Sequence, residues 1–121
     1  MIIRKKYIRK ANDNKMNKFI ITVAGKGGVG KTSLSAAIVR ELVKDFPKAR
    51  ILAIDADPAV GLSTALGVKV KLTMDEIRKR ITEGTSDSRD KQQIQALLAE
   101  AKYQLFDAIV EEDGFSFLAV G

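Results

Sequence analysis

Apolar residues along this chain follow two kinds of pattern. Three short runs, around 19–23, 50–55 and 115–120, are apolar and rich in β-branched and aromatic residues, which is typical of strands buried on both faces. Between them, apolar residues recur every three or four positions, as in amphipathic helices. This alternation of strands and helices predicts an α/β fold with a parallel sheet.

Three helices are predicted from the periodic segments. The first runs to about Phe46, where Pro47 stops it, and its apolar face comprises Leu34, Ile38 and Leu42, with Ala37 beside them. The second opens at Thr73 and Glu76, which form a capping-box pattern, and Gly84 is expected to close it.

The third helix is predicted from about Asp90 to Val110, after a polar loop at 85–90. Its apolar stripe consists of Ile94, Leu97, Leu98, Ala101 and Leu105. Two interpretations remain open for this segment: it packs against the sheet, or it helps to form the face that contacts a second subunit or partner. The basic residues of the preceding helix are interpreted as a solvated face: Arg78, Lys79 and Arg80.

The segment between the first strand and the first helix carries the clearest chemistry. Residues 25–32 read Gly-Lys-Gly-Gly-Val-Gly-Lys-Thr, which satisfies the phosphate-loop pattern G-x-x-x-x-G-K-[ST]. Glycines allow backbone N–H groups to converge on phosphate oxygens, Lys31 supplies a cation for the β and γ phosphates, and the Thr32 hydroxyl is placed to ligate Mg²⁺. A nucleoside triphosphate is therefore the expected ligand. Its binding residues are expected to be Gly25, Lys26, Gly27, Gly28, Val29, Gly30, Lys31, Thr32 and Ser33.

A second polar cluster, Asp55-Ala56-Asp57-Pro58, follows the apolar run 51–54. Ligands of parallel α/β sheets bind beyond the carboxyl ends of the strands, so both carboxylates are expected on the same rim as the phosphate loop. There, Asp55 and Asp57 can hold Mg²⁺ through water, or orient an attacking water. The alternative is that Asp57-Pro58 only ends the strand with a turn.

Taken together, these segments resemble a known family. The loop at 26–32, the Ile-Asp-Ala-Asp-Pro at 54–58 and the Leu-Ser-Thr-Ala-Leu-Gly at 62–67 are similar to the deviant Walker A ATPases. This family includes MinD and ParA, the nitrogenase iron protein, and the nickel-insertion accessory ATPase of carbon monoxide dehydrogenase. The last resembles residues 55–67 most closely, and its later strand resembles 117–121. The resemblance implies a P-loop NTPase with a doubly wound parallel sheet.

The resemblance also implies roles for individual residues. The extra lysine, Lys26, would reach across a homodimer to the partner's nucleotide and stabilise transition-state charge, as an arginine finger does. Lys31 and Asp57 would complete the catalytic set, with Asp57 near the metal and the attacking water. The metal site would comprise Thr32, Asp57 and, more weakly, Asp55.

The function implied is an ATP-hydrolysing dimeric switch that uses Mg²⁺ and assists nickel insertion into a client, carbon monoxide dehydrogenase. A spatial regulator of the MinD and ParA kind, a reductase-type ATPase, or a non-catalytic nucleotide binder remain alternatives. The family's switch II segment, an aspartate and glycine after a hydrophobic strand, is not found after Asp57, and the chain has no cysteine for nickel. Residues 16–121 are therefore expected to be an N-terminal portion of the domain with about three strands, truncated before switch II and inactive as an ATPase by itself.

The net charge of +6 lies almost entirely at the start of the chain. Residues 1–15 contain six basic residues and one acidic residue, whereas residues 16–121 are nearly balanced. We expect 1–15 to be a disordered leader that is an extension before a natural start at Met16, an arm without function, or an arm for nucleic acid or anionic lipid. Nucleic acid is not the expected main partner. The sequence contains no transmembrane run, and the ATP site without a secretion signal predicts a cytoplasmic protein.

Overall fold

A computed structural model describes residues 2–6, 18–86 and 90–121 of the chain. The strands are β1 (Ile2–Lys6), β2 (Lys18–Thr22), β3 (Arg50–Asp55), β4 (Val110–Glu112) and β5 (Phe115–Ala119). The helices are α1 (Lys31–Asp45), α2 (Gly61–Leu66), α3 (Met74–Ser86) and α4 (Lys91–Ala108). The predicted α/β class is confirmed, and the three predicted strands correspond to β2, β3 and β5.

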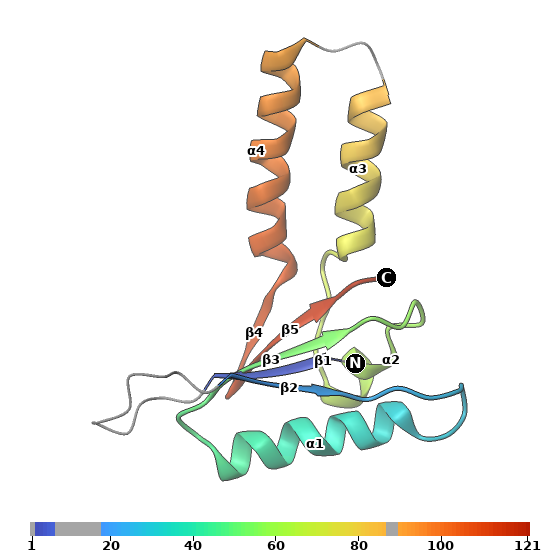
Figure 1. The fold of residues 1–121 in the computed structure, drawn as a ribbon, viewed down its shortest axis with the longest axis vertical. Coiled ribbons are helices and arrows are strands. Elements are labelled where there is room, and N and C mark those ends of the chain that lie inside the picture. Colours follow the sequence, from blue (N-terminus) through green and yellow to red (C-terminus); the bar gives the residue numbers. More distant parts are fainter. Residues whose placement is uncertain (1, 7–17, 87–89) are drawn as a thin grey trace.

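The strands form one sheet in the order β2-β1-β3-β5-β4, with α1 along one side (Figure 1). β3 and β5 are parallel, and β2 runs in the same direction as β3 because both are antiparallel to the strand between them, β1. The sheet is therefore mixed, rather than purely parallel as predicted. Because β2, β3 and β5 point the same way, their carboxyl ends all meet at one rim.

β1 corrects the expectation for the start of the chain. Residues 1–15 were expected to be disordered, but Ile2–Lys6 pairs along its whole length with both β2 and β3. A strand at this place supplies ladder partners to two strands that would otherwise leave unpaired backbone edges. Residues 7–15 lie outside the described residues.

β4 was also not predicted, because the helical stripe was continued to Val110. The helix ends at Ala108, and Val110–Glu112 then forms a hairpin with β5, in which Glu112 pairs with Phe115. The two-residue connection is Asp113-Gly114, with Gly114 at φ 85°. Asp-Gly between extended segments is a strong hairpin signal, because such tight turns need positive φ.

The core lies between α1, α2 and one face of the sheet. The residues of α1 that are buried there are Ser35, Ala36 and Val39, and they face buried sheet residues that include Ile51, Ala53 and Phe117. Ile38 and Leu42 pack against this core as predicted, but Leu34 is 56% exposed. The small side chains of Ser35 and Ala36 let the helix approach the sheet, so the buried face is rotated away from Leu34.

The opposite face of the sheet is less covered. On β3, Ile51 and Ala53 are buried, whereas Leu52 and Ile54, which alternate with them, are half-buried. Ile20 of β2 is 66% exposed. α1 and α2 therefore bury one face of the sheet and leave an apolar face that is partly open to solvent.

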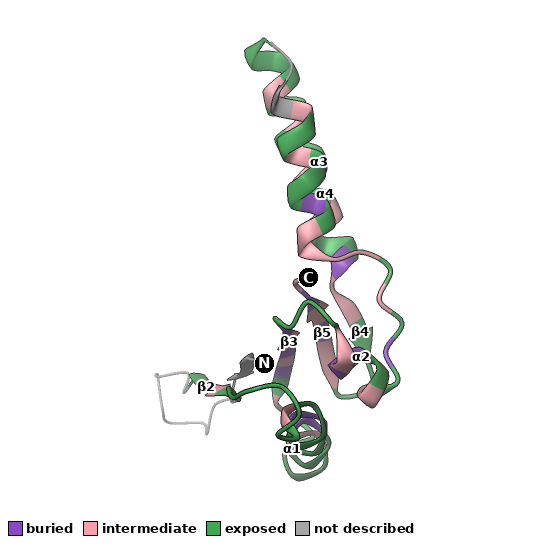
Figure 2. Ribbon diagram, turned by 90° about the vertical axis from the view of Figure 1, so that its right-hand side faces the viewer, coloured by how far each residue is buried: buried purple, intermediate pink, exposed green. Residues whose placement is uncertain are grey.

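Helices α3 and α4 pack against each other as a hairpin that projects away from the sheet, with a largely exposed surface (Figure 2). Of the two interpretations offered for α4, packing against the sheet is therefore wrong for most of its length. Among the hairpin residues whose burial the structure describes, the buried ones are Ile77 and Ala108, at its base. No helix in the described ranges is long and apolar enough to cross a membrane.

The start of α3 follows the predicted capping box. The Thr73 N–H donates to Glu76 Oε2 at 2.7 Å, and the Glu76 N–H donates to Thr73 Oγ1 at 3.2 Å. The first of these bonds, together with one from the Thr73 hydroxyl, lowers the pKa of Glu76. The predicted end is wrong, however, because α3 continues through Gly84 to Ser86. A Cβ on Gly84 would lie 2.6 Å from Leu97 Cδ2, so this glycine permits the close approach of α4.

Candidate nucleotide-binding site

The phosphate loop connects the end of β2 to the start of α1, as the motif requires. Gly30 is the N-cap of α1 at φ 87°, and Gly28 also has positive φ, at 80°. Both conformations are strained for residues with a Cβ. They turn the backbone so that the loop leads into the N-terminus of a 15-residue helix, where unpaired N–H groups and the helix dipole favour an anion.

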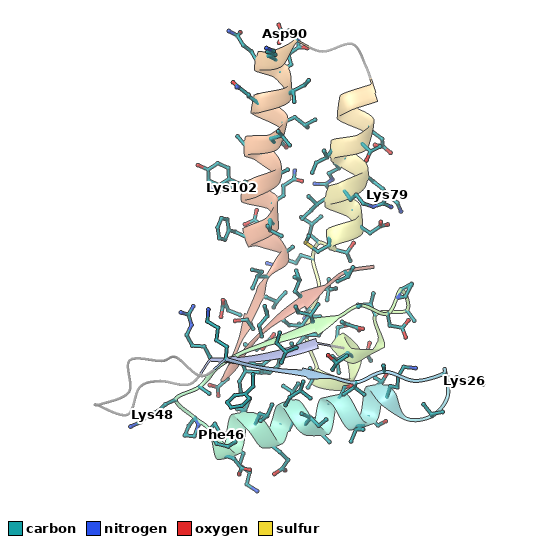
Figure 3. All side chains as sticks on the ribbon, viewed as in Figure 1. Lys26, Phe46, Lys48, Lys79, Asp90 and Lys102 are labelled. Atoms are coloured by element: carbon teal, nitrogen blue, oxygen red, sulfur yellow. The ribbon has the colours of Figure 1, made fainter. Side chains whose placement is uncertain are left out.

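The two lysines of the loop have different surroundings. Lys31, in the first turn of α1, is half-buried, and its ammonium donates to the carbonyl oxygen of Lys26 at 2.9 Å. Lys31 thus folds back over the loop that is expected to hold the phosphates. Lys26 is exposed and lies at the outer tip of the loop (Figure 3).

Asp55, at the end of β3, is 4% exposed. Its Oδ1 accepts the Asp57 N–H at 3.1 Å, and its Oδ2 accepts the Leu62 N–H at 3.0 Å. One buried carboxylate therefore accepts hydrogen bonds from both ends of the segment between β3 and α2 and holds these ends in place. This geometry favours a structural task for Asp55, which the sequence pattern alone did not indicate.

Asp57 lies in that segment and is exposed, and its Oδ1 accepts the Ala59 N–H at 3.0 Å. The segment then passes through Val60, whose φ of 49° is unusual for a β-branched residue. It ends beside the phosphate loop, since a Cβ on Gly61 would lie 3.6 Å from Thr32 Oγ1. The structure thus brings the two motifs predicted to share a rim close to each other.

These residues fit a Mg²⁺-nucleotide. A Cβ built on Gly27, Gly28 or Gly30 would meet no atom within 4 Å, so the space beside these glycines is open. In the described part of the chain there is no group of three or more His, Cys, Asp or Glu residues suited to hold a metal. Mg²⁺ in such sites commonly takes one or two protein oxygens, with phosphates and water supplying the others. Thr32 and Asp57 remain the candidates for these protein oxygens.

Asp55→Asn is expected to destabilise the fold by about 2 kcal/mol, because the amide can accept one of the two N–H groups but turns a donor toward the other. The matched control is Asp57→Asn, which keeps the oxygen that accepts the Ala59 N–H and should change stability by about 0.5 kcal/mol or less. Urea denaturation followed by circular dichroism measures both. Equal midpoints for the two variants would contradict the structural task of Asp55.

Comparison with protein families gives a match over residues 18–112 to the anion-transporting ATPases. This range contains the phosphate loop, the aspartate segment and the helical hairpin. The chain belongs to the anion-transporting ATPase family. Its fold is accordingly that of a P-loop NTPase, and the resemblance deduced from residues 26–32 and 54–67 is confirmed at this level.

Several curated proteins are similar to this family member. An ATP-binding protein of Methanocaldococcus jannaschii is 33% identical over 105 residues, covering 84% of this chain and 39% of the relative. ATPase GET3 of Zygosaccharomyces rouxii is 47% identical over 49 residues, and the carbon monoxide dehydrogenase accessory protein CooC of Rhodospirillum rubrum is 46% identical over 48 residues. Each of the last two matches covers 40% of this chain, and 14% and 18% of the respective relative. The chain thus spans well under half the length of these relatives, and no solved structure matches it.

Proposed function

We propose that this chain provides the nucleotide-binding part of a Mg²⁺-dependent ATPase that works as a dimeric switch. The observation that carries this proposal is the complete phosphate loop at the N-terminus of α1, with the Asp55–Leu62 segment beside Thr32. Bound Mg-ATP would supply the γ-phosphate whose hydrolysis drives the switch.

Within that site, we assign a separate task to each residue. The backbone of 25–30 and the ammonium of Lys31 would bind the phosphates, while the Thr32 hydroxyl and Asp57 would hold Mg²⁺ and orient water. Asp55 would keep Asp57 in place through the two backbone N–H groups that it accepts. Lys26 would act on the nucleotide of a second subunit, and its exposure at the tip of the loop supports this assignment.

The finer proposal is that the ATPase assists metallocentre assembly in the cytoplasm, with carbon monoxide dehydrogenase as client. It is supported by the similarity to the Rhodospirillum rubrum accessory protein and by the resemblance of the sequence at residues 55–67 to accessory ATPases of this kind. The chain contains no cysteine, so any thiolate ligand of nickel would have to come from another segment or protein.

Lys26→Ala tests the dimeric switch. In a form of the protein that dimerises with ATP, the variant is expected to bind ATP within about twofold of wild type, because the phosphate contacts of Lys31 and the loop remain. It should lose ATP-dependent dimerisation and turnover. Calorimetry, sedimentation and phosphate release measure the three properties, and Lys31→Ala serves as the variant that should lose all of them. A Lys26→Ala protein that still dimerises with ATP and hydrolyses it at the wild-type rate would refute the assignment.

A further inference from the structure

A pocket lies at the end of the sheet away from the phosphate loop. It measures about 310 Å³ and is formed where β2 and β3 begin, beside the β4–β5 hairpin. Its lining includes two cations, Lys18 and Arg50, two aliphatic side chains, Leu52 and Ile109, and the Ser116–Glu111 pair. Lys48 and the loop residue Lys26 are labelled near opposite ends of α1 in Figure 3.

The two cations of this pocket stand at the starts of two strands, Lys18 as the first residue of β2 and Arg50 as the first residue of β3. Lys6 of β1 is the register partner of both Lys18 on β2 and Arg50 on β3. Because Lys18 and Arg50 share this register partner, they lie at matching positions of β2 and β3 and on the same face of the sheet. Among the residues that the structure describes, neither Lys18 nor Arg50 forms an ion pair within 4.0 Å. An anionic group bound in the pocket would be attracted by both of these positive charges.

The remaining lining limits the kind of anion. Glu111 accepts the Ser116 hydroxyl at 2.9 Å, and its negative charge opposes a second anionic group on that side of the pocket. An adjoining pocket of about 270 Å³ shares Arg50, Glu111 and Ser116 and adds the carboxylate of Glu112. Negative charge is therefore favoured on the Lys18 and Arg50 side alone.

The aliphatic walls indicate what the rest of the ligand should be. Leu52 lies on the less covered face of the sheet, and Ile109 is the C-cap residue of α4. Both side chains are half-buried. An aliphatic body placed against them would remove apolar surface from water, which favours binding. A dicarboxylate or a polyphosphate would instead place charge against these walls and near Glu111.

We infer that this pocket binds a small monovalent organic carboxylate with an aliphatic body. The carboxylate lies between Lys18 and Arg50, and the aliphatic body lies against Leu52 and Ile109. This site is separate from the nucleotide site, since it lies where β2 and β3 begin rather than where they end.

Hexanoate is a suitable probe, and amide chemical shifts of the 121-residue chain report where it binds. Saturable shifts are expected at residues 18, 50 and 116, with little response to acetate, which lacks the aliphatic body, or to hexanol, which lacks the charge. Arg50→Gln should weaken hexanoate about tenfold, because it removes a charge-assisted hydrogen bond. Glu111→Gln should tighten binding, because it removes the opposing charge.

Lys48→Gln is the matched control, since Lys48 is an exposed cation close to Arg50 in sequence that does not line the pocket. It should leave hexanoate affinity unchanged. Lys18→Gln provides a second loss-of-charge variant should Arg50→Gln fail to fold, which circular dichroism would reveal. The inference is overturned if hexanoate causes no saturable shift, if acetate or hexanol binds as well, or if Lys48→Gln weakens binding as much as Arg50→Gln. It is equally overturned if the chain binds phosphatidylglycerol vesicles but not free hexanoate.

Discussion

Lys31→Ala is expected to weaken the binding of Mg-ATP or Mg-ADP about 100-fold or more. The variant removes a charge-assisted contact to the phosphates and leaves part of their charge unpaired, at a cost of about 3 kcal/mol. Calorimetric titration measures the loss. The Nζ of Lys31 donates to the Lys26 carbonyl oxygen at 2.9 Å, so the variant removes an ammonium group that is held against the loop.

Lys44→Ala is the matched control for Lys31→Ala, because Lys44 is an exposed lysine in the last turn of the same helix. It should bind nucleotide as the wild type does. Equal affinity in wild type and Lys31→Ala would refute the assignment of this loop as the nucleotide site.

Gly114→Ala should lower the free energy of unfolding by about 3 kcal/mol, combining backbone strain with overpacking. Gly114 has φ 85°, and a Cβ there would lie 2.4 Å from Val43 Cγ1 on α1. The hairpin of β4 and β5 would have to move away from the helix or lose its turn. Urea denaturation followed by circular dichroism provides the measurement.

Gly67→Ala separates strain from overpacking. Gly67 has φ 73°, but a Cβ on it would meet no atom within 4 Å, so this variant should lose only about 1–2 kcal/mol. Combining Gly114→Ala with Val43→Ala should remove the clash, so the double variant should lose less stability than the two single losses added together. If the two single losses of stability add exactly in the double variant, Val43 is not the side chain that disfavours a Cβ at position 114.

The sequence predicted those parts of the fold that depend on local pattern. The strand, glycine loop and helix at 18–45 and the capping box at Thr73 follow from residues close together in the chain. β1 was missed because five residues containing three cations resemble a solvated segment, and their pairing depends on strands far away. Periodicity also identified α3 and α4, but it shows only that a helix has an apolar face and not which surface covers it.

For the candidate site, the sequence supplied the residues but not their individual tasks. Asp55 and Asp57 were both expected to approach the metal, since they follow the same strand. The distinction arises because Asp55 is the buried last residue of β3, where its carboxylate accepts the Leu62 N–H seven residues later. Val60 carried no signal, because a left-handed conformation in a β-branched residue is imposed by its surroundings rather than by its own preference.

The last residues of the described chain connect the rim of the sheet to the helical hairpin. The Val120 N–H donates to the carbonyl oxygen of Asp55 at 2.9 Å, and the Val120 carbonyl accepts the Asp75 N–H at 2.8 Å. The backbone of Val120 thus lies between Asp55 and the first turn of α3. With 13 residues, α3 is about 20 Å long, so a tilt of about 10° at its base moves its tip by roughly 3 Å. A small tilt at the base of α3, next to Asp55, therefore produces a larger displacement at the tip of the hairpin.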